Sequence, residues 1–81
     1  MIRVTAVEPI EDYQLLIRLS DGRQGLFDMK PYLDLGVFQE LKDPAYFRLV
    51  QVEKHFGGIV WPHEQDLSPE TIEYKMRQSQ R

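Results

Sequence analysis

The residues best suited to chemistry lie in one short polar run, residues 63–66, which follows Trp61 and Pro62. Histidine and aspartate are common ligands of divalent metals, so His63 and Asp66 form a candidate metal pair. A metal site needs further ligands, and the spacing in this run matches no metal-binding motif. The simpler interpretation is a polar loop in which Asp66 supports the start of the next helix. We therefore expect no metal and no other cofactor.

Trp61 is the only tryptophan of the chain, and it closes a strand-like segment that begins at Ile59. A tryptophan in this position could stack on a base or anchor a partner protein. More often it packs under a neighbouring helix with its N–H hydrogen-bonded. Trp61, His63 and Asp66 are therefore the candidate surface for a ligand or partner, with a purely structural role as the simpler alternative.

No catalytic arrangement outweighs its structural interpretation. Asp28, Glu64 and Asp66 could supply a carboxylate pair, but acid–base chemistry requires proximity and a perturbed environment that a sequence does not display. Asp28 precedes a helical turn, where backbone N–H groups are its simplest partners. Gly57 and Gly58 suit a hairpin turn rather than a phosphate loop, and no serine lies at a strand–turn–helix elbow. We assign no catalytic residue and favour a non-enzymatic function.

Composition narrows the class of protein. The 81 residues suffice for one domain, residues 1–81, and the hydrophobic content of 42% is that of a globular chain. The net charge of −3 argues against direct nucleic-acid binding, which requires clustered Lys and Arg. Cysteine is absent and no apolar run approaches the roughly 20 residues of a membrane span. We expect a cytoplasmic protein without disulfides and without membrane contact.

The first third of the chain alternates as strands do. Residues 2–7 place Ile2, Val4 and Ala6 on one face with Val7 pointing away, and residues 14–19 follow the same period. Asp21-Gly22 is a strong signal for a two-residue hairpin loop. That loop would place Ile17 opposite Leu26 and Leu16 opposite Phe27.

The remainder indicates short helices, a second hairpin and a final helix. Pro31 and Asp43-Pro44 are helix-start signals, and Gly36 is a stop signal. A second hairpin turns near residues 56–58, and Ser68 caps a C-terminal helix. The fold class is therefore α+β: a small antiparallel sheet of about five strands in two hairpins, with short central helices and a C-terminal helix. The expected core comprises Leu15, Ile17, Leu19, Leu26, Phe38, Leu41, Phe47, Ile59 and Trp61.

Three sequence runs stand out: Leu15-x-Ile17-x-Leu19-x-Asp21-Gly22, then Gly36-Val37-Phe38-x-x-Leu41-x-Asp43-Pro44-x-x-Phe47, and finally Trp61-Pro62-x-x-x-Asp66-Leu67-Ser68-Pro69-Glu70. Together they resemble the small bacterial domain-of-unknown-function family DUF2442, and the resemblance covers nearly the whole chain. The resemblance implies a compact α+β domain and no established catalytic residues. Some members of that family are encoded beside other small proteins in toxin–antitoxin-like pairs, and some longer ones carry a helix-turn-helix domain.

Three functions stay open on this basis. The first is an interaction or regulatory module that acts by protein–protein contacts, as a homodimer or as the neutralising member of a toxin–antitoxin-like pair, because exposed sheet edges favour pairing. The second is a small ligand-binding domain or enzyme with its site near Trp61, His63 and Asp66. The third is an accessory part of a DNA-binding regulator without a helix-turn-helix of its own.

Overall fold

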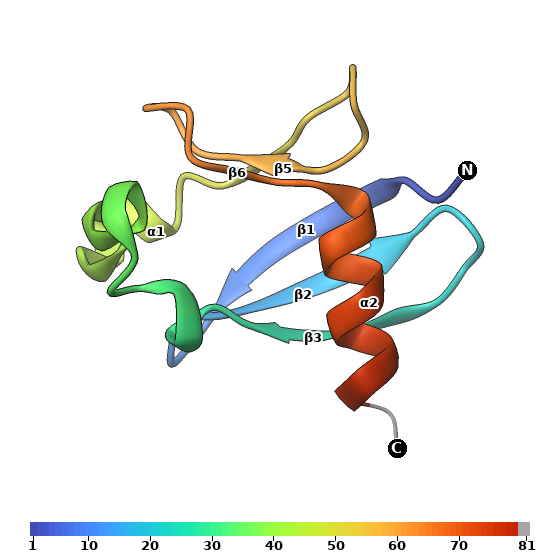
Figure 1. Ribbon diagram of the computed structural model, residues 1–81, viewed down its shortest axis with the longest axis horizontal. Coiled ribbons are helices and arrows are strands. Elements are labelled where there is room, and N and C mark those ends of the chain that lie inside the picture. Colours follow the sequence, from blue (N-terminus) through green and yellow to red (C-terminus); the bar gives the residue numbers. More distant parts are fainter. Residues whose placement is uncertain (80–81) are drawn as a thin grey trace.

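The computed structural model describes residues 1–79 and has an α+β fold with two antiparallel sheets, each of three strands (Figure 1). Sheet A has the order β1-β2-β3 and sheet B the order β4-β5-β6. The expectation of one sheet of about five strands is therefore wrong, although the α+β class and the C-terminal helix are confirmed. The strands are β1 (Val4–Ile10), β2 (Gln14–Leu19), β3 (Gln24–Asp28), β4 (Gln51–Val52), β5 (Ile59–Val60) and β6 (Asp66–Leu67).

The two sheets meet where the start of β1 lies beside the β4–β5 hairpin. The backbone N–H of Val4 donates a 2.6 Å hydrogen bond to the carbonyl of Gly57, and the Arg3 guanidinium donates to the carbonyl of Lys54. Contacts between β1 and β4 connect the sheets without a continuous strand ladder. The strands of sheet B are only two residues long. A segment this short has no alternation of polar and apolar residues, so β6 could not be predicted from the sequence.

The hairpin between β2 and β3 differs in register from the expected one by a single residue. Leu15 pairs with Phe27 and Leu16 with Leu26. The loop has three residues, because Gly22 adopts φ +92° and its N–H bonds the carbonyl of Leu19 at 3.0 Å. A slip of one residue exchanges the two faces of a strand. Phe27 is consequently buried, whereas Leu26 is 51% exposed, and its assignment to the core was wrong.

A second local irregularity lies in β1, where the register with β2 shifts between Val4 and Ala6. A β-bulge of this kind inserts one residue and reverses the alternation beyond it. Val7 is therefore partly buried against the core, and Ala6 is exposed. The expectation that Ala6 shares the face of Val4 while Val7 points away was wrong for this reason.

The two α-helices begin where the sequence predicts them. The Asp43 carboxylate accepts the Ala45 N–H at 3.0 Å, and the Ser68 hydroxyl accepts the Thr71 N–H at 3.2 Å. Gly36, predicted to end the first helical turn, adopts φ +40° and is instead the first residue of the second 3₁₀ helix, so this prediction was wrong. The helices are η1 (Lys30–Tyr32), η2 (Gly36–Lys42), α1 (Pro44–Phe47) and α2 (Pro69–Ser79). No described helix is both long enough and apolar enough to span a membrane.

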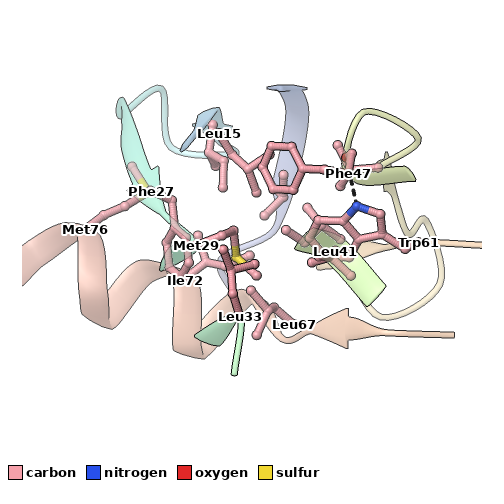
Figure 2. Close-up of a cluster of buried hydrophobic side chains, with 14 of the residues drawn as sticks. Leu15, Phe27, Met29, Leu33, Leu41, Phe47, Trp61, Leu67, Ile72 and Met76 are labelled. Atoms are coloured by element: carbon pink, nitrogen blue, oxygen red, sulfur yellow. Dashed lines mark hydrogen bonds between the residues drawn. The ribbon is translucent and has the colours of Figure 1, made fainter. Parts of the chain in front are cut away.

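One core fills the space between the sheets and the helices (Figure 2). The inward face of β2 supplies Leu15, Ile17 and Leu19, and α2 supplies Ile72 and Met76. In Figure 1, α2 crosses one face of sheet A, while α1 lies at the end of the molecule away from it. Seven of the nine expected core residues are buried, since Leu26 is exposed and Phe38 is only partly buried.

Candidate functional site

Two of the candidate residues, Trp61 and His63, lie on the turn that joins β5 to β6, and the third, Asp66, is the first residue of β6. The N–H of Trp61 donates to the carbonyl of Gln65 at 2.9 Å, and the N–H of Glu64 donates to the carbonyl of Trp61 at 3.0 Å. Glu64 adopts φ +74°, a left-handed conformation that few residues other than glycine take. Because the chain reverses so tightly, its neighbouring side chains contact different parts of the molecule.

Trp61 is part of the hydrophobic core. Its side chain is only 1% exposed, and its indole N–H donates a 2.9 Å hydrogen bond to the backbone carbonyl of Phe47 (Figure 2). The indole ring also contacts the Phe47 ring, with centroids 6.1 Å apart. With its polar atom bonded and its faces buried, the Trp61 ring is not presented for stacking on a ligand.

His63 is exposed and belongs to a polar network at the short helices. Its Nδ1 lies 2.7 Å from Oε2 of Glu40, and its ring stacks on Tyr46 with centroids 5.2 Å apart. The backbone N–H of His63 also donates to the Tyr46 hydroxyl at 2.8 Å. These contacts attach the turn to η2 and α1.

Gln65 completes this network from a buried position, with 3% of its surface exposed. Its side-chain amide donates to Oε1 of Glu40 at 2.8 Å and to the carbonyl of Val37 at 3.1 Å. Its carbonyl accepts the Tyr46 hydroxyl at 2.7 Å. The Gln65 hydrogen bond, and secondly the bond and charge of His63, lower the pKa of Glu40 below its ordinary value. Buried polar groups that are all hydrogen-bonded in this way fix a single geometry for the turn.

Asp66 lies on the outer face of sheet B, opposite Val60. A shallow groove of about 410 Å³ runs along this face. Its apolar lining comes from Leu49, which is 51% exposed, together with Val60 and Pro62. The groove is lined by Leu49, Gln51, Val60, Trp61, Pro62 and Glu64.

Two acidic side chains lie at or beside the groove. Glu64 lines it, and Asp66 flanks it through its pairing with Val60. Among the side chains that the structure describes, neither carboxylate has a hydrogen bond or an ion pair. Other acids of the chain are engaged, such as Glu73 with Arg77 and Asp34 with Lys42. We call the groove together with Glu64 and Asp66 the sheet B groove.

The three candidate residues Trp61, His63 and Asp66 therefore do not form one site. Asp66 and part of Trp61 border the sheet B groove, whereas His63 belongs to the network with Glu40. Within the described part of the chain, no three His, Cys, Asp or Glu residues gather as metal ligands.

Sequence reasoning missed Glu40, Tyr46 and Gln65, because their convergence depends on how the short helices pack. It also missed Leu49, whose exposure no local pattern signals.

The chain belongs to the DUF2442 family, described as proteins of unknown function, whose family model matches residues 4–78. No curated protein and no solved structure matches the chain. The family resemblance seen in the sequence is therefore confirmed, and the geometry of the surface carries the argument about function.

Proposed function

We propose that this protein is an interaction module that binds another protein through the sheet B groove. The observation that carries the proposal is the exposed apolar lining of Leu49, Val60 and Pro62 beside two carboxylates without partners. An exposed apolar recess with a polar rim is typical of a site for protein contact. The neutralising role suggested by the family resemblance is one form of this function and stays a prediction.

The groove defines the chemistry of its partner. An aliphatic or aromatic side chain would fill the recess, and burying it contributes about 1.5–3 kcal/mol. Lysine or arginine beside this anchor would face Glu64 and Asp66, which guides association more than it adds affinity. We therefore propose a partner segment in which an apolar anchor is adjacent to basic residues.

Affinity capture with three forms of the protein tests this proposal. The wild type and the Leu49→Gln variant would be compared with Leu35→Gln, a matched control because Leu35 is 55% exposed but lies outside the groove. We expect the same protein to be recovered by the wild type and the control and to be lost with Leu49→Gln. Cross-linking and mass spectrometry of that complex should place a basic, apolar-containing segment at residues 49–66. Equal recovery by all three forms would contradict the proposal.

A further inference from the structure

A small hollow lies where the turn between β1 and β2 meets α1, and both segments are at the same end of the molecule (Figure 1). Its volume is about 190 Å³, and its apolar lining comes from Ile10, Tyr13, Pro44 and Phe47. A cavity of about 150 Å³ can bind benzene, whereas pockets for larger ligands measure about 300–1,000 Å³. The hollow therefore has room for one apolar side chain or one aromatic ring.

The wall that the β1–β2 turn contributes is held in place by its contacts. Asp12 and Tyr13 adopt φ +64° and +59°, a left-handed conformation that is rare for a bulky residue such as tyrosine. The Tyr13 hydroxyl donates to the carbonyl of Lys42, and the Tyr13 ring meets Phe47 edge-on with centroids 5.3 Å apart. Lys30 pairs with the Asp12 carboxylate at 2.9 Å. A ligand would therefore enter a hollow whose walls are already ordered.

Two charges of opposite sign border the hollow without neutralising each other. Arg48 caps the C-terminal end of α1, and Glu11 belongs to the β1–β2 turn. Both side chains are exposed, and within the described part of the chain neither has a hydrogen bond or an ion pair, with the other or with a third group. A ligand that carries one charge of each sign would give both groups a partner.

We propose that this hollow binds a free α-amino acid with an apolar side chain, at a site separate from the sheet B groove. The ligand side chain lies against Tyr13 and Phe47, and the ligand carboxylate accepts a bidentate hydrogen bond from the Arg48 guanidinium. The ligand ammonium donates to the Glu11 carboxylate. A residue inside a polypeptide has neutral amides in place of both charges, so it would leave Arg48 and Glu11 without charged partners.

The exposure of the hollow sets a weak affinity. Arg48 and Glu11 remain in contact with solvent, where an ion pair contributes little, and the apolar contact is that of a single side chain. The lost translational freedom of the ligand offsets part of this gain. We expect a dissociation constant on the order of 1 mM, so the site would respond to an amino acid at millimolar concentration.

An NMR titration with L-phenylalanine tests the site. We expect chemical-shift changes that saturate and that are confined to the backbone amides of residues 10–13 and 45–48. Arg48→Gln and Glu11→Gln should each weaken binding roughly three- to fivefold, as expected for an exposed ion pair. Lys54→Gln is the matched control, because it removes one exposed positive charge away from the hollow and should leave binding unchanged.

Two analogues assign the charges of the ligand to the two side chains. Hydrocinnamate lacks the ammonium of phenylalanine, and phenethylamine lacks its carboxylate. Arg48→Gln should weaken the binding of hydrocinnamate and not that of phenethylamine. Glu11→Gln should have the opposite selectivity.

The absence of a saturable shift up to about 20 mM L-phenylalanine would overturn the proposal. Shifts spread over the whole chain, or equal affinities of Arg48→Gln and Lys54→Gln, would also overturn it. Thermal unfolding verifies that each variant is folded. Capture of a partner at the sheet B groove is expected to survive Glu11→Gln, so the two proposals fail separately.

Discussion

Trp61 and Phe47 are joined twice: the indole N–H of Trp61 donates to the Phe47 carbonyl at 2.9 Å, and their rings lie 6.1 Å apart. The hydrogen bond satisfies a carbonyl near the end of α1, where helical carbonyls lack partners within the helix. The pair thereby links the end of β5 to α1, and Trp61 also lines the sheet B groove.

Replacement of Phe47 should destabilise the protein strongly. Phe47→Ala removes a buried ring that also contacts Tyr13 with centroids 5.3 Å apart, and the expected loss is about 3–5 kcal/mol in the free energy of unfolding. Urea denaturation measures this loss. Phe56→Ala is the matched control, because Phe56 is 40% exposed and should change the stability by much less. Equal effects of the two substitutions would contradict the assignment of the core.

Substitution by alanine should destabilise the protein more at Gly58 than at Gly22. A Cβ on Gly58 would lie 2.0 Å from the backbone carbonyl oxygen of Leu67, so β5 and β6 must separate to admit it. We expect Gly58→Ala to cost about 3 kcal/mol or more, since backbone rather than a side chain has to move. Gly22 has open space around it, and only its φ of +92° opposes alanine, at a cost of about 1–2 kcal/mol. Thermal unfolding of both variants checks this order, and the reverse order would contradict the close pairing of β5 with β6.

Much of the fold could be predicted because its signals are local. The caps at Asp43 and Ser68 depend on a few neighbouring residues, and both are present as expected. The first hairpin was placed correctly but with the wrong register, because Asp21-Gly22 suits both a two-residue loop and the observed three-residue loop.

The candidate site was harder to predict, because its residues come from separate segments. Gln65 is buried although glutamine is usually exposed, and only the packing of η2 and α1 against the turn provides its partners. Likewise the groove depends on Leu49, which lies before β4, and on Pro62, which lies after β5, and the pairing of β4 with β5 brings the two together. Neither relationship has a periodicity that a sequence displays.

Acid should weaken the attachment of the 61–66 turn through Glu40. In the folded protein the pKa of Glu40 is lowered mainly by the hydrogen bond from Gln65 and secondly by His63. A carboxyl group with a lowered folded pKa stabilises the fold above its unfolded pKa, and this contribution disappears as the pH falls through the folded value. Glu40→Gln keeps a carbonyl acceptor but cannot ionise.

The variant should therefore be less stable than the wild type at neutral pH, and the two should converge as the pH falls below the ordinary value of 4.5. Urea denaturation as a function of pH measures both curves. Other carboxyl groups with lowered pKa values, such as Glu73 beside Arg77, contribute equally to both proteins and cancel in the difference. Curves that remain parallel down to acid pH would show that Glu40 does not contribute its charge to the fold.

The sheet B groove is tested most directly by the affinity of its captured partner as a function of salt concentration. We predict that Leu49→Gln weakens binding by a similar factor at every salt concentration, because it removes apolar contact. The double variant Glu64→Gln and Asp66→Asn should weaken binding at low salt and reduce its salt dependence. The variant lacks the two carboxylates whose attraction to the basic partner is screened by salt. A partner that binds the wild type and both variants with the same affinity at every salt concentration would contradict the proposal that this protein acts through the sheet B groove.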